Sequence, residues 1–195
     1  EAVRQEAFYR AMRRHFGILV DEEGEPEGGE WNYDRQNRKP IPEDMLIPDP
    51  LTFSPDQITR EVMSEVSGMR NRVGDLQPFQ LAVTSSQAEQ ALEDFIAHRL
   101  VHFGAYEDAM TARHPILFHS RLSPYLNLGT LSAGQVINRA LAAYQAGRAP
   151  LNSVEGFVRQ VLGWREYMYW QYWRVPDDFS LRNSWQAVNP LPDFF

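Results

Sequence analysis

Apolar side chains recur at intervals of three and four residues along most of this chain, which is the pattern of amphipathic helices. The first such stretch, residues 1–16, places Phe8 and Met12 on one face and ends at Gly17, a residue type that commonly terminates helices. The same period predicts further helices over residues 55–66, 86–103, 124–128, 133–146 and 153–173. The pattern therefore predicts a mainly α fold.

Several of these helices follow residues that can cap a helix N-terminus. In a capping box a Ser, Thr, Asp or Asn oxygen accepts a free backbone N–H, and a Glu or Gln three positions later returns the bond. These capping pairs set the predicted helix starts. The sequence offers this arrangement at Ser54 with Gln57, Ser86 with Glu89, Ser132 with Gln135 and Asn152 with Glu155.

Three parts of the chain lack a helical period. Residues 18–54 are first acidic and glycine-rich and then proline-rich, which favours an extended strip over the surface of a neighbouring domain. Within residues 79–83 apolar side chains alternate like a short extended segment. Residues 174–195 contain three prolines and Trp185, a candidate anchor. The chain begins inside a helical pattern without a start signal and stops at Phe194-Phe195 without a polar tail, which is the expectation for a piece of a larger protein.

The stretch Ser120–Leu126 combines a hydroxyl, an arginine, a second hydroxyl and a proline ahead of apolar residues. Ser123 is the expected N-cap and Pro124 the expected first helical residue, because proline has no N–H to leave unpaired. A helix N-terminus flanked by Ser120 and Arg121 suits an anion such as phosphate. An ordinary capped helix with a surface arginine is the alternative.

Arg165 interrupts an otherwise apolar helical stripe that contains Val158, Val161 and Met168. The pattern predicts that Arg165 lies on a buried face, where an unpaired guanidinium costs several kcal/mol. Glu166 is expected to point away from it, since adjacent residues are rotated by about 100° on a helix. Arg165 is therefore predicted to meet a phosphate or a carboxylate of another helix, such as Asp108.

Composition excludes some classes of protein. The 195 residues contain no cysteine, and the scattered histidines do not form a ligand set, so no metal site is predicted. A hydrophobic content of 43% supports a real core, while no apolar run suggests a membrane span or signal peptide. A cytoplasmic location is the expectation. The net charge of −7 argues against bulk-charge binding to nucleic acid.

Two motifs carry a resemblance to a known family. Ser120–Leu126, followed by Gly129 and Leu131-Ser132, and the later Trp164-Arg165-Glu166-Tyr167 resemble in order and spacing the flavin-binding half of the cryptochrome and photolyase family. The chain is most similar to the iron–sulfur bacterial cryptochromes and (6-4) photolyases, also called photolyase-related proteins. The segments that carry this closer resemblance are Phe8–Arg14, Gly28–Asp34 with Asn37 and Arg38, Phe103–Met110 and Ala149–Phe157.

The resemblance implies that residues 85–195 are the first half of a helical FAD-binding domain. Residues 1–84 are then an interdomain linker that includes an N-terminal helix and one short helix. A base flipped out of damaged DNA would enter a pocket beside the flavin, because a flavin cannot reach a lesion inside the stack. The resemblance assigns Phe103, Ser120, Arg121, Leu122, Ser123 and Arg165 to the cofactor, and Gln160 and Trp164 to DNA.

The implied activity of the parent protein is light-driven repair of UV-damaged DNA by electron transfer from reduced FAD. Many cyclobutane-dimer photolyases carry a glutamate at the position of Val161, and its absence favours (6-4) photoproducts as the lesion, or signalling. His119 stands where many relatives have threonine. A cryptochrome-like photoreceptor without repair, and a helical fragment with no cofactor bound, remain alternatives. The resemblance implies iron–sulfur ligands and an antenna domain outside this chain, assigns no catalytic residue within it, and leads us to expect that the fragment alone is inactive.

Overall fold

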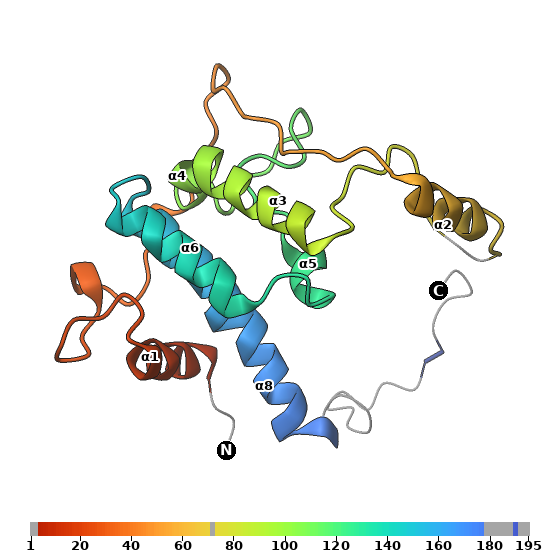
Figure 1. Ribbon diagram of the computed structural model, residues 1–195. Helices are drawn as coiled ribbons and strands as arrows, with labels where there is room; N and C mark the ends of the chain where they lie inside the picture. Colours follow the sequence, from red (N-terminus) through yellow and green to blue (C-terminus); the bar gives the residue numbers. More distant parts are fainter. Residues whose placement is uncertain (1–3, 71–72, 178–188, 191–195) are drawn as a thin grey trace.

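The computed structural model describes residues 4–70, 73–177 and 189–190. Within these ranges the structure is mainly α, as the sequence predicts, and contains no strand beyond an isolated bridge between Val20 and Pro26. Most helices pack around one core, while α2 stands apart from them (Figure 1). No described helix combines the length and the apolar character that crossing a membrane requires. The elements are α1 (Gln5–Phe16), η1 (Glu27–Gly29), η2 (Asp34–Gln36), α2 (Gln57–Ser67), α3 (Ser85–His98), α4 (Leu100–Phe103), α5 (Ser123–Asn127), α6 (Ala133–Gln145), α7 (Leu151–Val158), η3 (Arg159–Arg165) and α8 (Glu166–Arg174).

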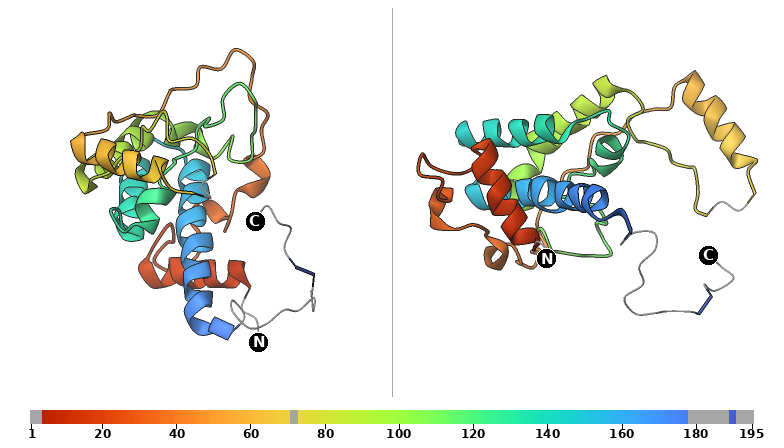
Figure 2. Two further views of the ribbon diagram at one scale, coloured as in Figure 1. Left: turned by 90° about the vertical axis from the view of Figure 1, so that its right-hand side faces the viewer. Right: turned by 90° about the horizontal axis from the view of Figure 1, so that it is seen from below.

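The N-terminal helix α1 lies across the helical run formed by η3 and α8 (Figure 2). It ends at Gly17, whose φ of 64° places it in the left-handed region that glycine adopts without strain, as predicted. Arg13 on this helix is fully buried. Its guanidinium donates to the carbonyl oxygens of Ile18 at 3.1 Å, Trp31 at 2.9 Å and Leu19, so it fastens the chain that follows α1.

Helices α3, α4, α6 and α7 enclose the centre of the core. Phe95, Phe103 and Phe157 stack there with ring centroids 4.8–5.9 Å apart. Gly104 ends α4 at a point where α7 comes very close, since a Cβ at this position would lie 2.7 Å from the backbone of Ser153. The same close approach lets the Gly104 N–H donate to the Ser153 hydroxyl at 2.9 Å. This contact sets the position of α4 against α7.

The helix predicted for residues 153–173 is one continuous run in three parts: α7, a π-helical segment η3, and α8. A π-helix has more residues per turn than an α-helix, so it rotates every later side chain relative to the predicted stripe. Val158 and Val161 are buried as predicted, whereas Met168 and Tyr172 are about half exposed. The single α-helical period assumed for the stripe is therefore wrong beyond Val161.

The predicted caps are correct at one site and wrong at others. Ser132 accepts the N–H of Gln135 at 3.2 Å, as predicted. Two other helices use a neighbouring residue that also carries an acceptor: Asp56 replaces Ser54, and Thr84 replaces Ser86. Pro150 rather than Asn152 precedes α7, and Leu122 rather than Ser123 precedes α5, without a side-chain cap in either case.

Residues 38–56 follow an irregular path along the α3–α4 side of the molecule to α2 (Figure 1). Backbone hydrogen bonds hold this strip: Lys39 N–H donates to the Ala105 carbonyl at 3.0 Å, and Leu51 N–H to the Asp94 carboxylate at 3.1 Å. The extended segment expected at residues 79–83 forms no strand. Trp185, the predicted anchor, lies outside the described residues.

Candidate functional site

A cavity of about 490 Å³ opens between α4, the loop that precedes α5, α5 itself and the α7–η3 run. Three separate stretches of sequence contribute to its walls. This volume lies within the range of sites that bind organic ligands. The lining residues are Phe103, Glu107, Asp108, His119, Ser120, Arg121, Leu122, Ser123, Leu126, Asn127, Phe157, Gln160, Val161 and Arg165.

The cavity brings together the residues that the sequence assigns to a cofactor. Phe103, Arg165 and the run from Ser120 to Ser123 all line it, although they are spread over more than sixty positions of the chain. Gln160, assigned to DNA, lines it as well. Trp164 does not: it lies on η3 with 45% of its surface exposed and outside the cavity lining.

The run from Ser120 to Ser123 contributes polar groups to the cavity lining that are available for an anion. The chain turns sharply at Arg121, whose φ of 57° is rare for a residue with a side chain. This turn lets the Ser120 hydroxyl accept the Leu122 N–H at 3.4 Å. Within the described part of the chain, the Arg121 guanidinium and the Ser123 hydroxyl have no hydrogen-bond or ion-pair partner. Because α5 comprises only five residues, these side chains rather than a helix dipole determine the affinity for an anion.

Several other residues of the cavity lining are apolar. Phe103 and Phe157 stack edge to face with their ring centroids 5.5 Å apart. Leu126 and Val161 extend this surface, and both are largely buried. A ligand that combines an anionic group with a flat apolar ring would match this mixed lining.

Arg165 joins the η3 segment to α5. Its side chain is 34% exposed, so it lies at the border of the buried face and not at its centre as predicted, because the π-helical turn changes its direction. It donates to the Leu126 carbonyl at 3.0 Å and pairs with Glu166, contrary to the prediction that Glu166 points away. The alternative partner Asp108 pairs instead with Arg38 at 3.3 Å. The Arg165 Nε is buried and finds no acceptor among the described residues.

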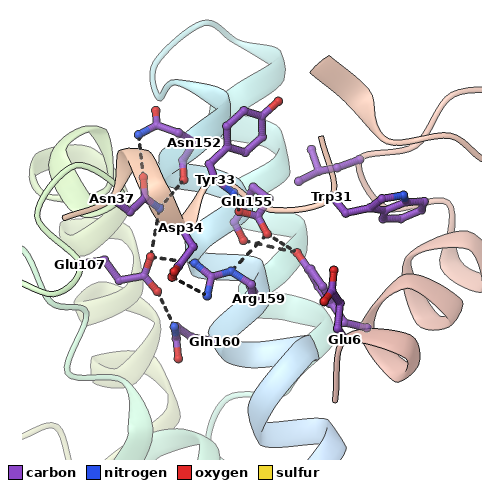
Figure 3. Close-up of polar contacts among 12 residues, drawn as sticks. Glu6, Trp31, Tyr33, Asp34, Asn37, Glu107, Asn152, Glu155, Arg159 and Gln160 are labelled. Carbon is purple, nitrogen blue, oxygen red and sulfur yellow. Dashed lines mark hydrogen bonds and ion pairs between the residues drawn. The ribbon is translucent and has the colours of Figure 1, made fainter. Parts of the chain in front are cut away.

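A network of polar side chains borders the cavity (Figure 3). Glu107 is its junction, and only 8% of that side chain is exposed. Its Oε2 accepts from Asn37 Nδ2 at 3.0 Å and pairs with the Arg159 guanidinium at 3.2 Å. Its Oε1 accepts from the side-chain amide of Gln160. Glu107 thus connects the segment after α1 to a residue on the cavity wall.

Glu155 forms the buried half of the same network. The carboxylate is completely buried, where it accepts from the Tyr9 hydroxyl at 3.0 Å and the Tyr33 N–H at 3.1 Å. The Arg159 Nε lies 3.4 Å from it. Burial raises the pKa of the Glu155 carboxyl above its ordinary value, although Arg159 acts in the opposite direction. Burial likewise raises the pKa of Tyr9, and the Glu155 charge adds to this effect.

Sequence reasoning missed Glu107 as part of the site. It follows a short helix within Tyr106-Glu107-Asp108, where no period or motif separates it from its acidic neighbour. The role of Glu107 can be identified only in the folded structure, because its partners Asn37, Arg159 and Gln160 come from distant segments. His119 is another lining residue without an assigned role, and one of its ring nitrogens lies 3.1 Å from the Glu107 carbonyl.

Comparisons with known proteins show which proteins this chain is similar to. Residues 1–81 match the family of deoxyribodipyrimidine photo-lyase-related proteins. A (6-4) photolyase of Agrobacterium fabrum is 45% identical over the entire chain, which spans 38% of the length of that relative. An uncharacterized protein of Acanthamoeba polyphaga mimivirus is 40% identical over 91 residues, which is 46% of this chain and 69% of the viral protein.

The mainly α fold and these matches define the class of protein that the chain resembles, the photolyase-related family. Within that family it is similar over its whole length to part of a (6-4) photolyase. The resemblance stated from the motifs is therefore confirmed. Because the chain covers well under half of that relative, the activity, substrate and partners of a whole protein are matters for proposal.

Proposed function

We propose that this chain supplies one wall of an FAD site in a flavoprotein that uses light to repair (6-4) photoproducts in DNA. The observation that carries this proposal is the common cavity of Phe103, Arg165 and the run 120–123, which lie far apart in sequence. Residues 85–195 act as the first half of the flavin-binding domain, and residues 1–84 act as the linker that precedes it.

The residues present fit this cofactor. The unpaired Arg121 guanidinium and Ser123 hydroxyl suit phosphate oxygens, because charge-assisted bonds to phosphate are strong and directional. The Arg165 Nε offers a further donor without a partner in the described structure. Phe103 and Phe157 give the apolar surface that a flat ring system requires. When bound, the flavin supplies the electron for repair, while these side chains hold it and exclude water.

Gln160 and Trp164 serve the DNA in this proposal. Both lie on η3, Gln160 at the cavity and Trp164 with an exposed ring beside it. A flipped base needs an apolar face to stack on and a polar group to read its edge. The apolar Val161 stands where many dimer photolyases carry a carboxylate, which supports a (6-4) lesion as the substrate.

A spectrum of the natural protein that carries this chain tests the flavin proposal. The protein is purified in the dark, its visible absorption is recorded, and the released cofactor is identified by chromatography. We expect a yellow protein that releases FAD. A folded but colourless protein contradicts the proposal.

Replacement of Arg165 by alanine in that protein tests the assigned residue. Arg165→Ala removes a donor at the cavity edge, so the retained FAD per protein should fall by about tenfold at limiting cofactor. Arg148→Ala is the matched control, since Arg148 is exposed on the loop before α7 and outside the cavity. Equal FAD content in both variants would reduce Arg165 to a structural role.

A repair assay addresses the substrate. Oligonucleotides that contain either a (6-4) photoproduct or a cyclobutane dimer are illuminated with blue light in the presence of the protein, and the lesions are counted. Repair of the (6-4) lesion alone supports the proposal. A flavin-loaded protein that repairs neither lesion favours a photoreceptor.

A further inference from the structure

The Gln160 side chain is held by one hydrogen bond with a defined direction. Its amide nitrogen points at Glu107, and its carbonyl oxygen lies on the far side of the amide group (Figure 3). A carboxylate that accepts other bonds cannot donate, so the group facing it must be the NH₂ of Gln160. Within the described structure the Gln160 carbonyl oxygen accepts no hydrogen bond.

The orientation of Glu107 is itself determined by its other partners. The Oε2 atom receives two donors, Asn37 Nδ2 and the Arg159 guanidinium. Asn37 cannot reverse its own amide without loss, because its Nδ2 also donates to the Asn152 carbonyl at 3.3 Å and its Oδ1 accepts from Asn152 Nδ2 at 3.1 Å. Glu107 therefore presents Oε2 to Asn37 and Arg159 and leaves Oε1 to face Gln160.

We propose that Glu107 is a positioning residue that turns the Gln160 carbonyl oxygen toward the ligand, so that this part of the cavity wall accepts a hydrogen bond from a nucleobase N–H. This inference rests on the proposed function, which brings a flipped base to Gln160. The imide N–H of a thymine-derived base is a donor of the required kind. A base that offers only a lone pair at that edge would leave two acceptors facing each other, which is unfavourable.

The proposal predicts the effect of replacing one carboxylate oxygen of Glu107 by an NH₂ group. In Glu107→Gln, the new carbonyl oxygen takes the place of Oε2, because Asn37 and Arg159 both donate there. The new NH₂ then faces Gln160, whose amide must reverse to accept it. The Gln160 NH₂ would point into the site and lose the preference for a base N–H. The exchange Glu107→Gln with Gln160→Glu restores an acceptor on the wall.

The test measures binding of two lesion-containing oligonucleotides by fluorescence anisotropy, one with thymine N3–H and one with the same position methylated. The ratio of the two affinities is compared, because removal of the Glu107 charge changes both affinities together. Gln160→Ala gives the part of the ratio that comes from the bulk of the methyl group. We expect a wild-type ratio about tenfold above that value. Glu107→Gln should fall to the Gln160→Ala value, and the double exchange should return to the wild-type ratio.

Asp108→Asn is the matched control, since Asp108 lines the same cavity but pairs with Arg38 and not with Gln160. A wild-type ratio in Glu107→Gln, or no recovery in the double exchange, overturns the proposal. Absence of lesion binding by the wild-type protein would instead count against the proposed function. The side-chain amide NMR signal of Gln160 then decides the inference alone, because a signal unchanged by Glu107→Gln overturns it.

Discussion

The polar network around Arg159 and the polar residues 120–123 of the cavity lining differ in how many of their groups have hydrogen-bond partners within the protein. In the network around Arg159, both oxygens of Glu155 and both of Glu107 accept hydrogen bonds from the protein. In the run 120–123 of the cavity lining, Arg121 and Ser123 have no partner in the described part of the chain. Groups that are paired internally contribute to folding, whereas unpaired groups beside a cavity are available to a ligand.

The largest expected effect comes from breaking the paired network. Glu155→Ala removes a buried carboxylate and leaves Arg159 and the Tyr9 hydroxyl without that acceptor. The free energy of unfolding of the chain should fall by about 3 kcal/mol. Urea unfolding followed by circular dichroism measures it.

The control for this change is Glu93→Ala, which removes an exposed ion pair with Arg139. Its cost should stay below about 1 kcal/mol. Similar losses in the two variants would show that the buried network is no more important for folding than a surface pair.

Replacement of the unpaired Arg121 should not lower the free energy of unfolding, in contrast to replacement of Glu155. Arg121 holds a φ of 57°, which costs a residue with a side chain about 1 kcal/mol but is free for glycine. Arg121→Gly should therefore leave the free energy of unfolding unchanged or raise it by about 1 kcal/mol, while FAD retention falls. Thermal unfolding and cofactor content, measured on the same preparation, test both parts. A parallel loss of stability and FAD would mean that Arg121 is a structural residue.

The smallest effect is the pH dependence of the network. The raised pKa of Glu155 means that the folded state keeps a proton that the unfolded state releases. Stability from this group is thus fully present below the ordinary value of 4.5 and is lost as the pH rises through the folded pKa. The stability of the wild type relative to Glu155→Gln should decline over that range in urea titrations.

The pH dependence of stability that comes from Asp94 should have the opposite sign to that from Glu155. Burial acts to raise the pKa of Asp94, but the Leu51 N–H and the Arg99 guanidinium together lower it. Its contribution is present above the ordinary value of 3.8 and is lost as the pH falls through the folded pKa. Asp94→Asn should therefore reduce stability near neutral pH more than in acid. The same slope for both variants would contradict these directions.

The sequence predicted the class of structure well, because helix formation depends on local signals. Apolar side chains at helical spacing indicate a helix whatever its partners are, and the mainly α fold follows from that period. The Gly17 stop and the Ser132 cap are also local, since each depends on residues within one turn. The motifs at 120–126 and 164–167 carried the family for the same reason.

The sequence was least reliable where a prediction depended on register or on distant partners. The burial of Arg165 was wrong because a π-helical turn changes the direction of later side chains without any period that announces it. Leu122, and not the predicted Ser123, directly precedes α5. The Ser120 hydroxyl accepts the Leu122 N–H across the turn at Arg121. Small shifts of this kind move single side chains in or out of a site.

By itself, the sequence determined which segments are helical and which residues are candidates for phosphate, flavin and DNA. Only the tertiary structure decided which of them share a cavity, that Trp164 lies outside its lining, and that Glu107 accepts a hydrogen bond from Gln160. The physical reason is the separation in sequence between the residues that interact. Helix formation depends on neighbours within a few positions, whereas the partners of Glu107 come from three segments that only the packed core brings together.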